Sequence, residues 1–127
     1  MPKKVLIIDD DKDLVTASTV ALEAAGYEVA AAYSGAEGLA KSRQAGADAI
    51  ILDVMMESMG AGFQVARELH ADAGLADTPV IMLTSINKEE LGLRYGADED
   101  WNPVDVFLDK PVTAEQLVAE VRKALGD

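Results

Sequence analysis

The feature that most constrains this chain is an alternation of short apolar runs with longer segments of helical periodicity, repeated five times from end to end. Three of the runs are apolar throughout, which is typical of buried parallel strands. Alternating strands and helices with short connections imply right-handed crossovers. We therefore predict a doubly wound α/β domain, for which a five-stranded parallel sheet in the order 2-1-3-4-5 is a common arrangement. The predicted strands are Val5–Ile8, Glu28–Tyr33, Ala49–Leu52, Val80–Leu83 and Val106–Leu108.

The predicted helices also carry recognisable ends. A capping residue and its reciprocal partner stand three positions apart at three helix starts, namely Ser34 with Glu37, Asn87 with Glu90, and Thr113 with Gln116. Glycines follow three of the helical segments, at Gly26, Gly46 and Gly126. The acidic Asp11 is expected to cap the first helix rather than to take part in chemistry. These signals place the helices between the strands with few free residues.

Composition limits the classes of function. The 127 residues carry 11 basic and 23 acidic side chains, and the net charge of −12 argues against direct binding to nucleic acid. Without cysteine, the chain has no disulfides, thiolate metal sites or cysteine nucleophile, and it suits a reducing cytoplasm. The apolar run Val5–Ile8 is too short for a signal peptide or a membrane span. We expect one cytoplasmic domain over residues 1–127.

Polar residues follow the ends of four predicted strands. They are Asp9 and Asp10 after the first, Asp53 after the third, Thr84 and Ser85 after the fourth, and Asp109 and Lys110 after the fifth. Ligands of such sheets bind beyond the carboxyl ends of the strands, where these side chains would meet. Crowded carboxylates repel one another unless a cation lies among them, and an all-oxygen set suits Mg²⁺. Asp53 is then a candidate nucleophile toward phosphorus.

The same residues carry a family resemblance. The segments Leu6–Asp11, Ile51–Met56, Val80–Ser85 and Phe107–Pro111 together resemble the motif set of two-component response-regulator receiver domains of the chemotaxis-receiver type. The resemblance covers essentially the whole chain and implies a flavodoxin-like (βα)5 fold. Because the chain ends just after the fifth predicted helix, we expect a stand-alone, single-domain receiver.

The resemblance implies roles for individual residues. Asp53 matches the phosphoacceptor. Asp10 and Asp53, with the backbone carbonyl of Met55, match the Mg²⁺ ligands, and Asp9 matches a residue that binds the ion directly or through water. Lys110 matches the lysine that pairs first with the carboxylate and then with the phosphoryl group, and its bond to the following proline matches one that is cis in this family.

Two further residues match the family's switch. Thr84 matches the hydroxyl that moves to meet the phosphoryl oxygens, and Phe107 matches the aromatic ring that turns inward after it. Met55 and Ile86 stand at positions that control the access of hydrolytic water in the family. Both are apolar, which predicts slow loss of the phosphoryl group.

The implied function is phosphorylation-switched signalling. A sensor histidine kinase or a histidine phosphotransfer protein would supply the phosphoryl group, and a downstream target protein would read the result. Two alternatives stay open: an adaptor that works without phosphorylation, and a phosphatase that forms an aspartyl phosphate. The phosphatase normally needs a second acid two positions after its nucleophile, where Met55 stands. We expect no enzymatic activity beyond the chain's own phosphorylation and slow dephosphorylation.

The largest departure from the family pattern lies in one segment. Between Leu91 and Val106, glycines, three consecutive acids, Trp101 and a proline replace a regular fourth helix and a short turn. We predict a short helix followed by a long loop there. Long loops in compact domains tend to be functional.

Overall fold

The computed structural model describes residues 2–53, 61–72, 74–75, 77–84 and 106–127. Its strands form one parallel sheet in the order β2-β1-β3-β4-β5, which confirms the predicted fold class and strand order. The strands are β1 Lys4–Ile8, β2 Glu28–Ala32, β3 Ala49–Asp53, β4 Val80–Thr84 and β5 Val106–Asp109. The helices are α1 Lys12–Ala24, α2 Gly35–Ala45, α3 Ala61–Ala71 and α5 Ala114–Leu125.

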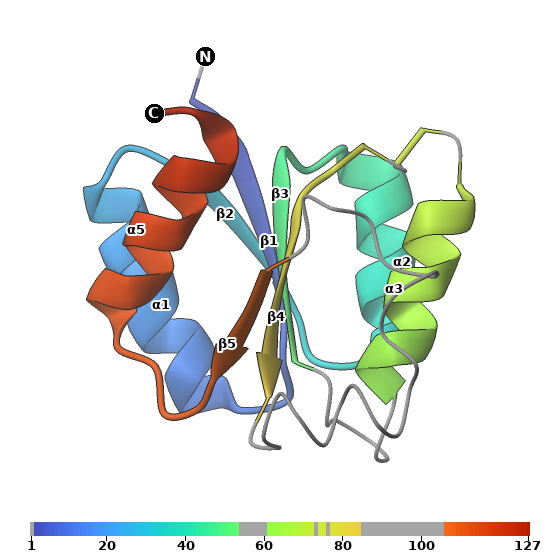
Figure 1. Ribbon diagram of the computed structural model, residues 1–127, viewed down its shortest axis with the longest axis horizontal. Helices are drawn as coiled ribbons and strands as arrows, with labels where there is room; N and C mark the ends of the chain where they lie inside the picture. The colour runs from blue at the N-terminus through green and yellow to red at the C-terminus, as the bar shows by residue number, and fades with distance from the viewer. Residues whose placement is uncertain (1, 54–60, 73, 76, 85–105) are drawn as a thin grey trace.

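Helices cover both faces of the sheet, α1 and α5 on one side and α2 and α3 on the other (Figure 1). Successive side chains of a strand point to opposite faces, so each central strand contributes side chains to two hydrophobic cores, one on each face of the sheet. In β1, Val5 and Ile7 pack in the core under α1 and α5, whereas Leu6 and Ile8 pack in the core under α2 and α3. This double burial explains why the central strands are apolar at every position except one terminal residue each.

The helix ends follow the predicted caps, with one difference. Asp11 caps α1, and Thr113 with Gln116 forms a complete capping box at α5. Ser34 caps α2 by accepting a hydrogen bond from the Glu37 backbone N–H, but the Glu37 carboxylate bonds the N–H of Tyr33 instead of that of Ser34. The predicted cap at Asn87 lies outside the described residues.

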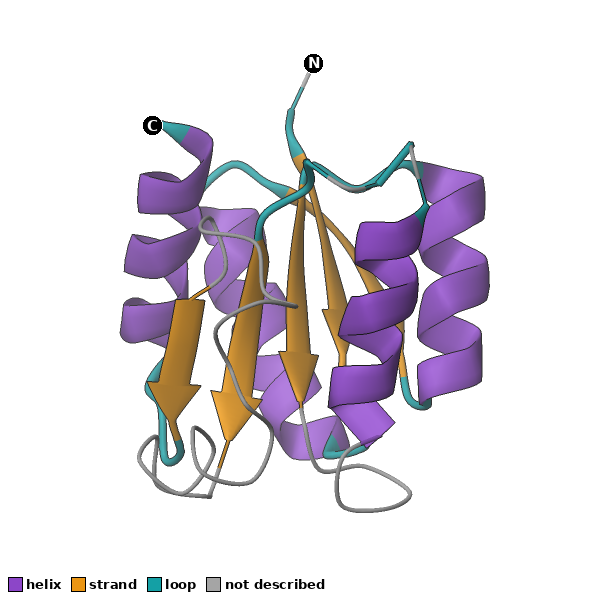
Figure 2. Cartoon of the chain, turned by 45° about the vertical axis from the view of Figure 1, so that its right-hand side comes forward, coloured by secondary structure: helices purple, strands orange, loops and turns teal. Residues whose placement is uncertain are grey.

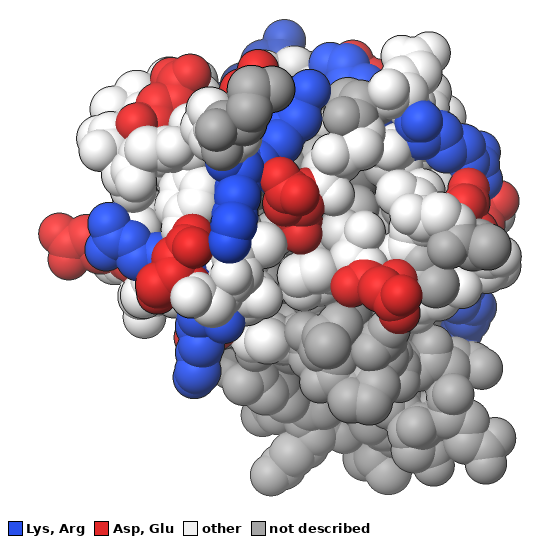
Figure 3. Space-filling view, turned by 90° about the horizontal axis from the view of Figure 1, so that it is seen from above, with Lys and Arg blue, Asp and Glu red and all other residues white. Residues whose placement is uncertain are grey.

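The two ends of the chain lie at the same end of the molecule, and Figure 3 shows basic and acidic side chains interspersed there. The Lys3 ammonium lies 3.0 Å from an Asp127 carboxylate oxygen, and the Tyr27 hydroxyl donates to the other oxygen at 2.8 Å. These contacts attach the end of α5 to the start of the sheet. Among the described helices, none has the length and apolar character that crossing a membrane requires.

Candidate functional site

The carboxyl ends of all strands point toward one end of the molecule (Figure 2). Asp9 directly follows β1, Asp53 is the last residue of β3, and Lys110 directly follows β5. The register pairs Ile8 with Leu52, so Asp9 and Asp53 leave adjacent strands at the same level. The fold therefore brings together three of the side chains that the sequence placed at strand ends.

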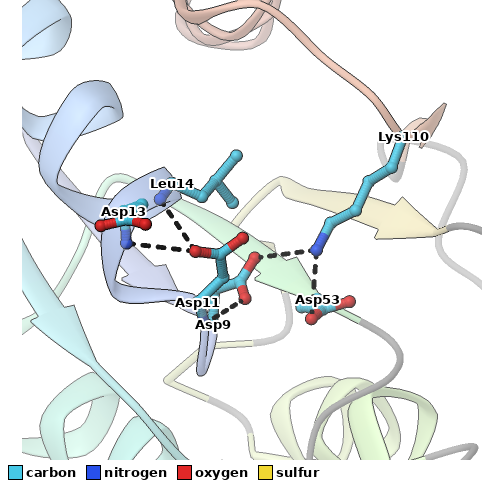
Figure 4. Close-up of polar contacts among 6 residues, drawn as sticks. All are labelled: Asp9, Asp11, Asp13, Leu14, Asp53 and Lys110. Carbon is cyan, nitrogen blue, oxygen red and sulfur yellow. Dashed lines mark hydrogen bonds and ion pairs between the residues drawn. The ribbon is translucent and has the colours of Figure 1, made fainter.

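Asp9 is held at both carboxylate oxygens. Its Oδ1 accepts a hydrogen bond of 2.9 Å from the backbone N–H of Asp11, and its Oδ2 lies 3.3 Å from the Lys110 ammonium (Figure 4). Its own backbone N–H donates to the carbonyl of Ala32, which continues the pairing of β1 with β2. Asp9 is completely buried, so its orientation is set by these contacts.

Lys110 joins the two buried carboxylates. Its ammonium is 3.3 Å from Asp9 Oδ2 and also 3.3 Å from Asp53 Oδ2. Asp53 is 3% exposed, whereas the Lys110 side chain keeps 24% of its surface in solvent. The cation thus closes the site from the β5 side, opposite the loop that follows β1 (Figure 4).

Asp10 completes an acidic group that fits a metal ion. Asp9, Asp10 and Asp53 each offer a carboxylate oxygen, and these atoms all lie within 4.8 Å of one another. Asp10 is exposed while the other two are buried, so an ion bound among them would be reached from solvent on the Asp10 side. An all-oxygen donor set of this kind suits Mg²⁺ or another hard divalent cation.

The electrostatics of the site reflect its crowding. Burial and, after it, the neighbouring charge of Asp53 together raise the pKa of Asp9 from 3.8 to about 6, against the lowering effects of the Asp11 N–H and of Lys110. Burial disfavours the charge on Lys110, but the carboxylates of Asp9 and Asp53 outweigh that effect and raise the pKa of the lysine. The three acids of the site outnumber its one base, and a divalent cation would offset the excess negative charge.

The other predicted site residues are placed only in part. Thr84 is the last residue of β4 and Phe107 lies within β5, but their side chains lie outside what the structure describes. Met55, Ile86 and the segment around Trp101 lie outside the described residues altogether. The Lys110–Pro111 peptide bond is cis, as the resemblance implied.

Sequence reasoning missed one contributor to the site, the backbone N–H of Asp11 that binds Asp9. An aspartate that accepts a hydrogen bond from the N–H two residues later is an Asx turn. Asp11 repeats the pattern by accepting from the N–H of Asp13 (Figure 4). Aspartates spaced two apart after a strand are a signal from which both turns could have been predicted.

Comparison with known proteins agrees with this geometry. The family model of the response regulator receiver domain matches residues 5–122. The chain is 38% identical over 128 residues to the DNA-binding dual master transcriptional regulator RpaA of Synechocystis, covering 98% of this chain and 49% of RpaA. It spans about half the length of the curated relatives that it matches.

Two solved structures extend the agreement. The chemotaxis response regulator CheY4 of Vibrio cholerae is 31% identical, with a TM-score of 0.82 over 98% of this chain and 100% of CheY4. A putative response regulator from Chloroflexus aurantiacus is 28% identical, with a TM-score of 0.84 and full coverage of both chains.

Proposed function

This chain belongs to the response regulator receiver family, and from that premise we propose that it is switched by phosphorylation of Asp53. The observation that carries the proposal is the position of the Lys110 ammonium, 3.3 Å from both Asp9 and Asp53. A cation shared by two buried carboxylates can follow negative charge that is added to either of them. Asp53 ends the central strand β3 within the acidic group, and it is the carboxylate that matches the family's phosphoacceptor.

The reaction is transfer of a phosphoryl group from a phosphohistidine of a sensor kinase or a histidine phosphotransfer protein. A carboxylate oxygen of Asp53 forms the new bond to phosphorus, and the bond from phosphorus to the imidazole nitrogen breaks. The electron pair of that bond stays on the imidazole nitrogen that carried the phosphorus, and the ring leaves as neutral imidazole because its other nitrogen keeps a proton. Lys110 then pairs with the phosphoryl oxygens.

Asp9, Asp10 and Asp53 would hold Mg²⁺, together with the Met55 carbonyl that the family resemblance adds to the set. The three carboxylates fit such an ion because their oxygens lie within 4.8 Å of one another. When bound, Mg²⁺ supplies positive charge that lets an anionic phosphoryl donor approach an anionic site. Asp9 contributes through an orientation already imposed by Asp11 and Lys110.

Phosphorylation adds about one to two negative charges at neutral pH. Thr84 and Phe107 are the residues that we expect to respond, by shifting an existing equilibrium between two conformations. The shifted surface would then bind a downstream target protein in the cytoplasm. Regulation of this kind needs no direct contact with nucleic acid by the acidic receiver domain.

The proposal is tested by intact mass spectrometry after incubation with acetyl phosphate, with and without Mg²⁺. We expect one phosphoryl adduct that requires Mg²⁺ and that is absent from Asp53→Asn. Asp10→Asn should reduce the adduct because it removes one metal ligand. Asp77→Asn is the matched control, because it removes an exposed carboxylate remote from the three-residue acidic group.

Two results would count against this function. An adduct that persists in Asp53→Asn would place the phosphoryl group on another residue. The complete absence of an adduct, from acetyl phosphate and from a phosphorylated histidine donor alike, in a chain that circular dichroism shows to be folded, would favour an adaptor that does not need phosphorylation.

A further inference from the structure

The outer strand β2 has an open edge. In the described sheet β2 pairs only with β1, and its other side has no strand beside it. The Glu28 N–H donates to the carbonyl of Lys3, and the Ala32 carbonyl accepts from the N–H of Asp9. Because backbone groups alternate in direction along a strand, Val29, Ala31 and Tyr33 direct their N–H and C=O groups outward. Such an edge is a template for pairing with another chain.

Two side chains of α2 occupy this edge. Glu37 Oε1 accepts a hydrogen bond of 2.7 Å from the backbone N–H of Tyr33, and the Lys41 ammonium donates to the carbonyl of Ala31. The two side chains also pair with each other, with 3.4 Å between the Lys41 ammonium and the second carboxylate oxygen of Glu37. The bond from Tyr33 is the main reason that the pKa of Glu37 is lowered, and Lys41 adds to it.

The occupied groups are those that a second copy would need. Antiparallel pairing of two β2 strands about a twofold axis at Ala31 joins the N–H of each Ala31 to the C=O of the other. It also joins the N–H of each Tyr33 to the C=O of Val29 in the other copy. The Ala31 carbonyl already accepts a hydrogen bond from Lys41, and the Tyr33 N–H already donates one to Glu37. Both bonds therefore compete directly with contacts inside the chain.

Apolar surface beside the edge would favour such pairing. Val29 and Ala31 line a shallow groove between β2 and α1, together with Val20 and Tyr33. Val20 is 64% exposed and Tyr33 is 41% exposed, although both are large apolar side chains. A second copy seated against β2 would remove part of this surface from water, which favours association by roughly 25 cal/mol per Å² of apolar area buried.

We propose that the open edge of β2 is a latent pairing surface for a second copy of this chain, and that the Glu37–Lys41 pair keeps it closed. The pair works by occupying the Ala31 acceptor and the Tyr33 donor from within the chain. The surface is separate from the acidic site, so the inference does not depend on the proposed function. Removing Glu37 and Lys41 frees the Tyr33 N–H and the Ala31 carbonyl to form hydrogen bonds with β2 of a second copy.

The test compares two double variants that each remove one acid and one base and so leave the net charge at −12. Glu37→Ala/Lys41→Ala opens the edge. Arg43→Ala/Asp72→Ala is the matched control, because it removes an ion pair of the same 3.4 Å length that bonds no strand edge. Sedimentation velocity over a concentration series measures self-association, and amide hydrogen exchange measures protection at Val29 and Ala31.

We expect the edge variant to associate with a constant at least tenfold above those of the natural chain and of the control. Its Val29 and Ala31 amides should become protected as the concentration rises. Self-association equal to the control, or association without protection of these two amides, would overturn the proposal. If the double variant does not fold, Lys41→Ala alone frees the Ala31 carbonyl and is judged by the same two measurements.

Discussion

Gly38 is the position where the packing makes the sharpest prediction. It lies in α2 against β1, and a Cβ atom added there would stand 2.6 Å from Ile8 Cδ1 and 2.8 Å from both Ile8 Cγ1 and Cγ2. Ile8 is completely buried and directly precedes Asp9. A β-branched side chain has little freedom at its first torsion, so the whole Ile8 side chain would have to move. The substitution Gly38→Ala therefore overpacks the core beside the site.

Two effects set the magnitude. Overpacking a core costs about 1–3 kcal/mol, and three contacts below van der Waals distance on one stiff residue put this case near ~3 kcal/mol. Replacing a helical glycine by alanine returns about 1 kcal/mol of helix propensity. We expect a net loss of about 2 kcal/mol in the free energy of unfolding, which lowers the melting temperature of a domain of this size by roughly 8 °C.

Urea unfolding of four variants separates the two effects: Gly38→Ala, Ala40→Gly, Ile8→Val and the double variant Ile8→Val/Gly38→Ala. Ala40→Gly, at an exposed position of the same helix, measures the propensity difference alone and should cost about 1 kcal/mol. Ile8→Val removes the nearest contacting atom, so Gly38→Ala should cost about 1 kcal/mol less in that background. If Gly38→Ala instead stabilises the chain by as much as Ala40→Gly destabilises it, the close approach of α2 to β1 is refuted.

Three further predictions concern the site and its supports. Lys110→Ala removes the ammonium 3.3 Å from two carboxylates, so Mg²⁺ should raise the melting temperature of this variant more than that of the natural chain; an equal or smaller rise contradicts the charge argument. Because the pKa of Asp9 is raised to about 6, this residue binds more protons in the folded chain than in the unfolded chain near pH 5, and its contribution should lower the metal-free stability by up to ~3 kcal/mol between pH 4 and 7. Urea midpoints in chelator test this, and Asp9→Asn should flatten the slope. Thr113→Ala breaks the capping box of α5 and should lower the free energy of unfolding by about 1 kcal/mol. Thermal unfolding measures this loss against the control Thr16→Ala, which removes a threonine that lies inside α1 and caps no helix.

The sequence predicted the sheet well because each of its central strands contains an uninterrupted apolar run of four residues. The structure lengthens β3 to Asp53 and β4 to Thr84, one residue beyond each apolar run, and ends β2 one residue before Tyr33. These differences have one cause. Hydrophobic pattern reports which side chains are buried, whereas a strand ends where its backbone pairing ends. Asp53 still pairs with Leu83 of β4, although its side chain is polar.

The sequence predicted which residues form the site, but not the distances between their side chains. Asp9, Asp53 and Lys110 converge because parallel strands end at one side of the sheet. That the Lys110 ammonium lies equally far from both carboxylates depends on register and side-chain conformation, which no spacing in the sequence encodes. The same holds for Glu37, whose spacing from Ser34 predicts a bond to the backbone N–H of that residue. The carboxylate instead reaches Tyr33 because this N–H is left free at the edge of β2.

The protonation of Asp9 connects stability with binding. A completely buried carboxylate beside Asp53 is costly to ionise, and its raised pKa measures that cost in the metal-free chain. A leucine there would make a more stable core, but it would offer no oxygen to a cation. A divalent ion bound among Asp9, Asp10 and Asp53 would favour the ionised form and recover the free energy that burial removes. The acidic site thus lowers the stability of the metal-free domain, and the same unfavourable term would favour the binding of a cation.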